Sequence, residues 1–193
     1  MDAVLRLRKN DVLNISKNDK LCNEKTMSVG INWDGDADMD LMCFAFKDGK
    51  LDASGVCFYD QPHIYGISHT GDVKTSSGMA DLVKKEIELD MDKIKNKYNR
   101  ILFLVTIYEE DPHVTKERRT KFGNIVMTAG LTSSTEKTLI AQSPISENYP
   151  SEYGIKLLEI YLEDGDFKYR LLNQAEEKDF GDYLTEYGIP FKR

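Results

Sequence analysis

Short apolar or alternating runs dominate the chain and are separated by clusters of turn residues. The runs are rich in β-branched and aromatic residues, which is typical of strands. Because no long helices alternate with these runs, the pattern favours an all-β fold, an antiparallel β-sandwich, over a parallel α/β sheet. The predicted strands, about nine in number, lie within residues 27–33, 41–46, 56–60, 86–91, 101–110, 123–131, 138–145, 157–164 and 166–174.

Turn and helix signals complete this pattern. Asp-Gly pairs at 48–49 and 164–165 stand between predicted strands, and such pairs favour the primed turns of β-hairpins. Residues 90–99 predict a short turn or helix, and 176–188 predict a short C-terminal helix that ends at a glycine before a proline. Residues 60–85 predict a long loop, and loops of that length inside a domain are usually functional or mobile.

Length and charge narrow the classes of function. The chain has 193 residues, and 40% of them are hydrophobic, which is enough for a real core and predicts one domain over residues 1–193. The net charge of −7 disfavours nucleic acid as a partner, because binding to phosphates requires a basic surface. An acidic surplus is better suited to cations.

The three cysteines, Cys22, Cys43 and Cys57, show no paired metal-binding spacing, so neither a zinc site nor a disulfide framework is expected. They are interpreted as buried thiols in a reducing compartment. No long apolar segment follows the N-terminus, and no stretch has the length needed to span a bilayer. A cytoplasmic protein without a transmembrane segment is predicted.

The segment WDGDADMDL at residues 33–41 carries carboxylates at every second position, Asp34, Asp36, Asp38 and Asp40. In an extended segment these side chains share one face, at spacings of roughly 6.5 to 7 Å. Two unit charges at that distance repel each other by roughly 2 kcal/mol at an effective dielectric constant near 20. The repulsion must be offset, either by open solvent or by a bound hard cation, which prefers oxygen ligands.

An EF-hand is the first motif to test against this segment. Asp34, Asp36 and Asp38 match ligand positions one, three and five of its loop, but the motif also requires glycine at position six and glutamate at position twelve. Met39 and Ala45 stand at those positions, and a predicted strand replaces the exiting helix. The EF-hand is therefore excluded.

Two enzymatic interpretations use the same carboxylates. Asp38 and Asp40 have the spacing of a phosphoryl-transfer pair, but that chemistry needs a nearby lysine and a βα crossover that the strand-rich pattern does not supply. A metal-dependent hydrolase would use the carboxylates to hold an ion that activates water. The sequence shows no obvious general base for it.

Segments spread along most of the chain resemble the TerD family of tellurium-resistance and stress-response proteins. Each match is short, but the matches occur in one order, which makes the resemblance specific. The matching segments are 31–41 (family GWD and DFDLDAS), 58–61 (FYNN), 69–83 (HTGDNRTGEGDGDDE), 105–109 (VTIHD), 122–125 (FGQV) and 158–174 (GELYRHNGEWKFRAVGQ).

The resemblance implies a β-sandwich that binds one or two calcium ions through aspartates on loops at one end and has no established enzymatic activity. It implies work alongside other tellurium-resistance proteins, with a peripheral membrane complex as one setting. Met79, Leu82 and Val83 replace family acidic residues, so ligand oxygens are missing and one of two sites is expected to be weakened or lost. The implied metal ligands are Asp34, Asp36, Asp38, Asp40, Asp60, Gly71, Asp72 and Asp81.

Other residues have both a structural and a functional interpretation. Trp33 is expected to pack in the core under the aspartate loop, and His69 is expected to make a structural hydrogen bond, since histidine prefers softer ions than calcium. The acidic residues at 109–111 suit either a second ion site or a polar strand end. The basic segment 116–121 suits either an acidic partner or a solvated loop.

The leading hypothesis is a non-enzymatic calcium-binding module of a tellurite-resistance or stress-response system. The main alternative is a calcium-dependent membrane-surface binder similar to a C2 domain, which is also a sandwich with aspartates at its loop tips. Such binders need basic or apolar residues beside the ions. Here the flank is mainly acidic, with Lys74, Lys84 and Lys85 as exceptions.

Overall fold

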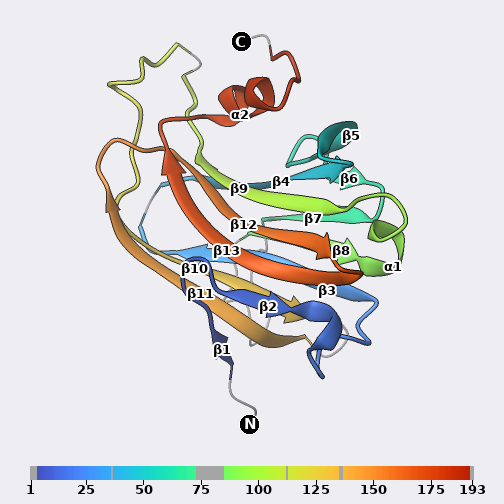
Figure 1. The fold of residues 1–193 in the computed structure, drawn as a ribbon. Helices are drawn as coiled ribbons and strands as arrows, with labels where there is room; N and C mark the ends of the chain where they lie inside the picture. Colours follow the sequence, from blue (N-terminus) through green and yellow to red (C-terminus); the bar gives the residue numbers. More distant parts are fainter. Residues whose placement is uncertain (1–3, 36, 73–84, 112, 135–136, 192–193) are drawn as a thin grey trace.

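The computed structural model describes residues 4–35, 37–72, 85–111, 113–134 and 137–191 as two β-sheets that face each other (Figure 1). Neighbouring strands are antiparallel except for β1 and β11, which pair in parallel. The first sheet has the order β1 (Leu5–Arg6), β11 (Thr138–Tyr149), β10 (Gly123–Ser133), β3 (Thr26–Trp33), β8 (Lys85–Asp90), β7 (Ile67–Asp72) and β6 (His63–Ile64). The second has the order β2 (Val12–Asn14), β13 (Asp166–Glu176), β12 (Gly154–Glu163), β9 (Arg100–Ile107), β4 (Met39–Lys47) and β5 (Lys50–Cys57).

The all-β sandwich predicted from the sequence is confirmed, and each of the nine predicted runs overlaps an observed strand. The long loop predicted over residues 60–85 is wrong in part, because β6 and β7 lie within it. β6 is too short to give a pattern, and β7 has one strongly apolar residue, Ile67. Its position is fixed by tertiary contacts: β7 pairs with β8, and the ring Nε2 of His69 lies 3.1 Å from the backbone oxygen of Leu41.

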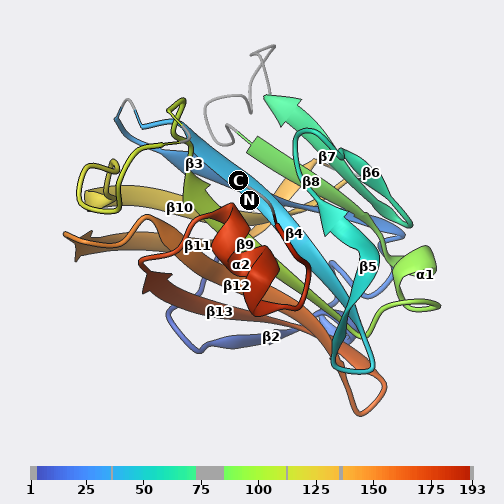
Figure 2. The same ribbon diagram turned by 90° about the horizontal axis from the view of Figure 1, so that it is seen from above.

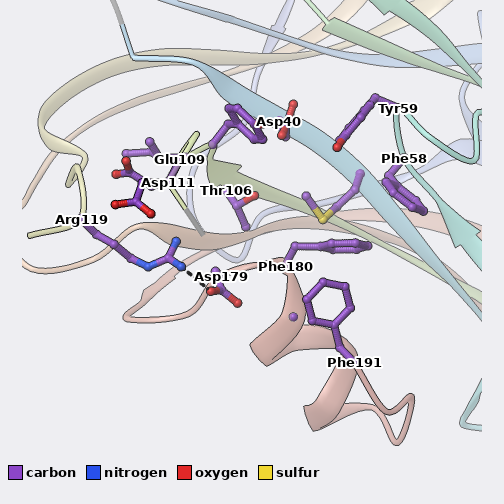
Figure 3. Close-up of a pocket in the computed structure, with 14 residues that line it drawn as sticks. Asp40, Phe58, Tyr59, Thr106, Glu109, Asp111, Arg119, Asp179, Phe180 and Phe191 are labelled. Carbon is purple, nitrogen blue, oxygen red and sulfur yellow. Dashed lines mark hydrogen bonds and ion pairs between the residues drawn. The ribbon is translucent and has the colours of Figure 1, made fainter. Parts of the chain in front are cut away.

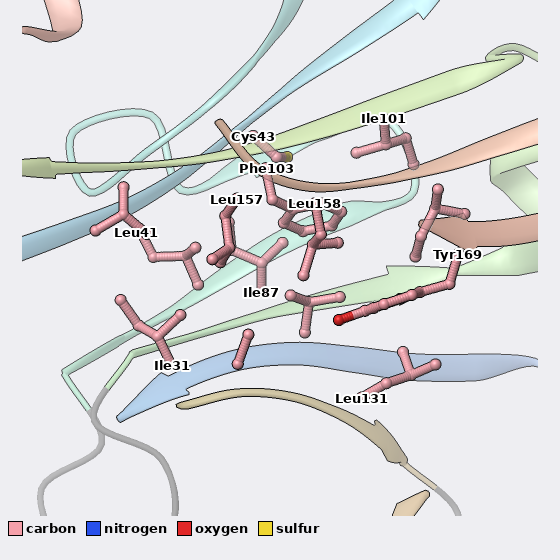
Figure 4. Close-up of a cluster of buried hydrophobic side chains, with 14 of the residues drawn as sticks. Ile31, Leu41, Cys43, Ile87, Ile101, Phe103, Leu131, Leu157, Leu158 and Tyr169 are labelled. Carbon is pink, nitrogen blue, oxygen red and sulfur yellow. The ribbon is translucent and has the colours of Figure 1, made fainter. Parts of the chain in front are cut away.

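The main core lies between the two sheets and is built from alternating positions (Figure 4). In β4, Leu41 and Cys43 belong to this core, whereas Phe44 and Phe46 belong to a second buried cluster on the outer face. A sheet that is covered on both faces has strands that are apolar without interruption. This double burial explains why residues 41–46 form a continuous apolar run.

The outer face of the second sheet is covered by α2 (Phe180–Glu186), which lies over β4 and β9 (Figure 2). The other helices among the described residues are α1 (Met91–Ile94) and one 3-10 turn at Ile15–Lys17. Both predicted helices are therefore confirmed, although each is shorter than its predicted range. None of the helices in the described ranges is long and apolar enough to cross a membrane.

Both predicted hairpin turns are present. The first residue of each pair adopts the left-handed region, with φ of 51° at Asp48 and 54° at Asp164, and a glycine with positive φ follows each one. These angles match a type I′ turn, which requires positive φ at both central residues. The hairpins fix the register of β4 with β5 and of β12 with β13.

The cysteines follow the sequence prediction at two of three positions. Cys43 and Cys57 are buried opposite each other on β4 and β5, and both are free thiols. Cys22 is exposed, which corrects the prediction that all three are buried. It lies in a turn after Leu21, and Leu21 supplies the buried side chain of that turn.

The N-terminus of α2 depends on Asp179. Its Oδ1 accepts a hydrogen bond from the backbone nitrogen of Asp182 at 2.9 Å, and the Asp182 side chain accepts one in return from the backbone nitrogen of Asp179. Oδ2 of Asp179 also pairs with Nη2 of Arg119 at 2.7 Å, where both side chains are nearly buried. One carboxylate therefore caps the helix and holds a loop from another part of the chain.

Replacing Asp179 with alanine is expected to lower the free energy of unfolding by about 2 kcal/mol, since the capping interaction and a nearly buried ion pair are lost together. Urea denaturation followed by far-UV circular dichroism measures the change. Glu177→Ala, which removes an exposed carboxylate nearby, is the matched control. A loss no larger than that of the control would contradict the role of Asp179.

Candidate functional site

The aspartate-rich segment connects the two sheets at one end of the sandwich. β3 ends at Trp33 in the first sheet, and β4 begins at Met39 in the second. The connection is anchored on both sides. The indole Nε1 of Trp33 donates a hydrogen bond to the backbone oxygen of Ala37 at 2.8 Å, and the backbone nitrogen of Tyr108 donates one to the backbone oxygen of Asp38 at 2.8 Å. Trp33 is buried, as predicted.

The predicted aspartates do not form one extended row. Asp40 alone lies within β4, whereas Asp34 and Asp38 lie in the connection before it. The rule that alternate side chains share a face applies to strands and does not fix the direction of loop side chains. Asp34 is exposed, the Asp38 side chain is 62% exposed and the Asp40 side chain is 17% exposed.

Asp38 and Asp40 nevertheless converge on one point, and a lysine occupies it. Nζ of Lys85 lies 2.9 Å from Oδ1 of Asp40 and 3.3 Å from Oδ1 of Asp38. Lys85 begins β8, opposite Ile31 of β3, and its side chain is only 10% exposed. The repulsion between these two carboxylates is therefore offset by an ammonium group of the chain itself.

The other predicted ligands are divided between described and undescribed residues. Asp60 is exposed and follows β5. Gly71 and Asp72 lie in β7, where the backbone of Asp72 pairs with Lys85. Asp36 and Asp81 lie outside the described residues. Within the described ranges, no three histidine, cysteine, aspartate or glutamate side chains are arranged to hold a metal ion.

The residues that the structure does place suit a hard cation in their chemistry, although they do not complete a site. Calcium takes six to eight oxygen ligands, many of them carboxylates. Asp38 and Asp40 direct one oxygen each toward a single cationic group. Further oxygens would have to come from Asp34, from Asp60 or from predicted ligands whose side chains are not described.

A hollow of ≈ 350 Å³ lies beside Asp40 on the outer face of the second sheet (Figure 3). It contains the acidic residues that follow β9, Glu109 and Asp111, and one basic residue, Arg119. We call it the aromatic–acidic pocket. It is lined by Asp40, Met42, Phe58, Tyr59, Thr106, Ile107, Tyr108, Glu109, Asp111, Arg119, Asp179, Phe180, Gly181 and Phe191.

The pocket changes the interpretation of two segments. Arg119 comes from the basic segment 116–121, for which a solvated loop was one interpretation, yet its guanidinium pairs with Asp179 at a nearly buried position and lies over the ring of Tyr153. Sequence reasoning missed Asp179, Phe180 and Phe191 as pocket residues. The contact of Asp179 with Arg119 joins residues 60 positions apart, and Phe180 packs against Phe58 from a still more distant segment, so no local pattern signals these pairings.

Tyr59 lines the pocket and lies near acidic groups. Partial desolvation, followed by the charges of Asp60, Tyr108 and Asp40, raises the pKa of the Tyr59 hydroxyl above its usual value. Asp60, a predicted ligand, directly follows Tyr59, and Tyr59 lines the same pocket as Asp40, so Asp60 lies on the same side of the molecule as Asp40. The structure therefore brings Asp38, Asp40 and Asp60 to one end of the sandwich.

The fold and these loops define a β-sandwich protein that carries Asp38, Asp40 and Asp60 at one end. Residues 4–187 match the TerD domain family, so the chain belongs to the TerD family of tellurium-resistance and stress proteins.

Named relatives cover almost the whole chain. It is 26% identical over 187 residues to tellurium resistance protein TerD of Serratia marcescens, covering 91% of this chain and 94% of the relative. It is 24% identical over 177 residues to general stress protein 16U of Bacillus subtilis (strain 168), covering 83% and 86%. A solved homologue of telluride resistance protein (TerD) from Streptomyces coelicolor A3(2) has a TM-score of 0.55 at 13% identity, covering 87% of this chain and 100% of that one.

Proposed function

We propose that this protein is a non-enzymatic calcium-binding module of a tellurite-resistance or general stress response, in which bound calcium controls contact with a partner. Its family membership and the names of its relatives support the cellular role. The observation that carries the calcium assignment is the convergence of Asp38 and Asp40 on one cationic position.

The proposed ligands are those predicted from the sequence, and Asp38 and Asp40 are the best supported of them. Asp72 is a reasonable further ligand because its backbone pairs with Lys85, the residue that contacts both carboxylates. Asp34 and Asp60 are exposed on neighbouring connections, and Asp36, Gly71 and Asp81 complete the set. Calcium would link the connections in which these ligands lie and so reduce their freedom to move.

The proposed setting follows the family. The protein acts in the cytoplasm with other tellurium-resistance proteins, including at a peripheral membrane complex. Its acidic surface, with a net charge of −7, argues against nucleic acid as the partner. Calcium changes the charge and the rigidity of the loops at one end of the sandwich, and that end is the proposed contact surface.

Calcium is expected to raise the melting temperature of the protein, because an ion that binds only the folded state stabilises it by about 2.7 kcal/mol at a hundredfold excess over Kd. The double variant Asp38→Asn, Asp40→Asn is expected to lose most of this rise. Thermal unfolding at millimolar calcium and calorimetric titration with magnesium as a competitor measure the effect.

The matched control is Asp48→Asn, Asp164→Asn. It removes the same number of carboxylates at the hairpin turns of the opposite end, where asparagine tolerates the left-handed backbone. The control is expected to keep the full response to calcium. A melting temperature that calcium leaves unchanged in the wild-type protein would refute the proposed function.

A further inference from the structure

The aromatic–acidic pocket has two distinct halves. Glu109 and Asp111 lie on one side, with the guanidinium of Arg119 beside them, and the rings of Phe58 and Phe180 lie on the other (Figure 3). The rings form a continuous group: Phe58 and Phe180 have centroids 4.8 Å apart, and Phe180 and Phe191 have centroids 5.9 Å apart. The pocket therefore offers carboxylates at one side and aromatic surface at the other.

The charged residues that line the pocket determine whether it attracts a cation or an anion. Four carboxylates line the pocket, and one guanidinium opposes them. That guanidinium is already committed to Asp179 at 2.7 Å, and the carboxylate of Asp40 contacts Lys85. An anion would be repelled here, and a cation attracted.

Glu109 and Asp111 retain capacity to accept hydrogen bonds. Oε1 of Glu109 accepts from the backbone nitrogen of Thr120, and Oδ1 of Asp111 accepts from that of His113 at 2.8 Å. Each carboxylate thus uses one oxygen to hold its own loop. Its other oxygen has no hydrogen-bond partner within the described ranges, so it is available to a donor that enters the pocket.

The spacing of the acids distinguishes a bare metal ion from a larger cation. Among the described residues, no three acidic side chains gather closely enough to hold a metal ion. The carboxylates instead stand around a hollow of ≈ 350 Å³, within the range of small-molecule sites. Aromatic rings attract organic cations through their electron-rich faces, and a metal ion would gain little from them beside carboxylates.

The protein already shows this combination at the wall of the pocket. The Arg119 guanidinium lies 5.2 Å from the centroid of the Tyr153 ring and pairs with Asp179. Its position demonstrates that a planar cation is stable at this wall of the pocket between an aromatic ring and a carboxylate. The neighbouring carboxylates and the rings of Phe58 and Phe180 present similar groups to a ligand from outside.

We propose that the aromatic–acidic pocket binds an organic cation, a guanidinium, amidinium or ammonium group on an apolar body. The charged head lies between Glu109 and Asp111, and the apolar body lies against the rings of Tyr59, Phe58 and Phe180. The source of the cation is either a free small amine or guanidine, or an arginine or lysine side chain of a partner.

The test uses benzamidine, which is cationic at neutral pH, and benzamide, its neutral counterpart of nearly the same shape. Binding to the full chain is followed by NMR shifts of selectively labelled phenylalanine and tyrosine rings in calcium-free buffer. Benzamidine is expected to bind at least about tenfold more tightly than benzamide, with the largest shifts at Phe58, Tyr59 and Phe180. Equal affinity for the two compounds, or shifts confined to other rings, would overturn the proposal.

Two variants test the two halves of the pocket. Tyr59→Leu removes an exposed ring and Glu109→Gln removes a charge while keeping an oxygen that accepts from Thr120, so both proteins should fold. Each is expected to weaken benzamidine binding by about threefold to tenfold. The controls Tyr65→Leu and Glu163→Gln make the same changes at exposed positions outside the pocket and are expected to leave binding unchanged. Unchanged binding in both pocket variants would contradict the assignment.

A second pair of ligands separates the sources of the cation. Agmatine represents a free guanidine, and the capped peptide acetyl-Gly-Arg-Gly-amide represents a side chain of a partner. Tighter binding of one identifies the source, whereas failure of both, together with benzamidine, refutes the site. Because the variants spare the predicted calcium ligands and the buffer lacks calcium, this result is independent of the proposed function.

Discussion

Replacing Lys85 with methionine is expected to increase the calcium affinity of the protein by about tenfold to a hundredfold, which corresponds to about 1.4 to 2.7 kcal/mol. In the wild-type protein, the ammonium contacts oxygens of Asp38 and Asp40 that calcium would need. These contacts are charge-assisted, and the lysine side chain is only 10% exposed, so they resist displacement. Methionine fills similar volume without charge, which leaves both carboxylates free for the ion.

In the absence of calcium, the same substitution is expected to destabilise the folded protein. The two carboxylates lose their shared cation and repel each other, so the free energy of unfolding should fall by about 1 to 3 kcal/mol in a chelator. Calcium should then restore the loss, and the calcium-dependent rise in melting temperature should exceed that of the wild-type protein. Calorimetric titration and thermal unfolding, each with and without calcium, measure both effects.

Two controls separate this mechanism from general destabilisation. Lys85→Arg keeps a cation at the same position and should retain calcium affinity near that of the wild-type protein. Lys97→Met removes an ion pair of comparable length, 3.3 Å to Asp52, near the start of β9 at the opposite end of the sandwich. It should lower stability without changing calcium affinity. An unchanged affinity in Lys85→Met would show that calcium, if it binds, uses neither Asp38 nor Asp40.

The strands were predictable because burial leaves a local pattern. β9, which is buried on both faces, contains the continuous apolar run ILFLV at residues 101–105. β12 and β13 flank a turn whose Asp-Gly pair adopts positive φ. β7 was missed because its sequence, ISHTGD, alternates weakly and its position depends on contacts with β8 and β4. Local chemistry therefore predicted the sheets, and pairing between distant segments decided the exceptions.

The candidate site was also predictable only where a local pattern signals it. The spacing of Asp38 and Asp40 signalled that their repulsion must be offset, and the two side chains do share a partner. The partner is Lys85, more than forty positions away, and the sequence alone suggested solvent or a bound ion instead. The pairing of Arg119 with Asp179, 60 positions apart, could not be predicted from the sequence for the same reason. A charged residue near such a site in space cannot be recognised from its neighbours in the chain.

Glu159 is the most deeply buried charged side chain in the described part of the second sheet. Its side chain is only 3% exposed on the outer face of β12. Oε2 accepts a hydrogen bond from Nε of Arg100 at 2.6 Å, and Oε1 accepts from Nε of Arg170 at 2.8 Å and from its Nη2. The two guanidiniums, from the flanking strands β9 and β13, lie over the rings of Phe46 and Tyr161. They neutralise a carboxylate that would otherwise be buried alone.

Replacing both arginines with methionine is expected to lower the free energy of unfolding by about 3 to 5 kcal/mol, the usual cost of leaving one member of a buried ion pair without its partner. Urea denaturation at neutral pH measures the loss. The decisive comparison is the triple variant Arg100→Met, Glu159→Leu, Arg170→Met, in which the buried charge is also removed. It is expected to regain most of the lost stability, because apolar side chains of similar volume can replace a buried ion pair at little cost. If the triple variant were as unstable as the double variant, the arginines would act through their packing on Phe46 and Tyr161, and Glu159 would not be the reason for their position.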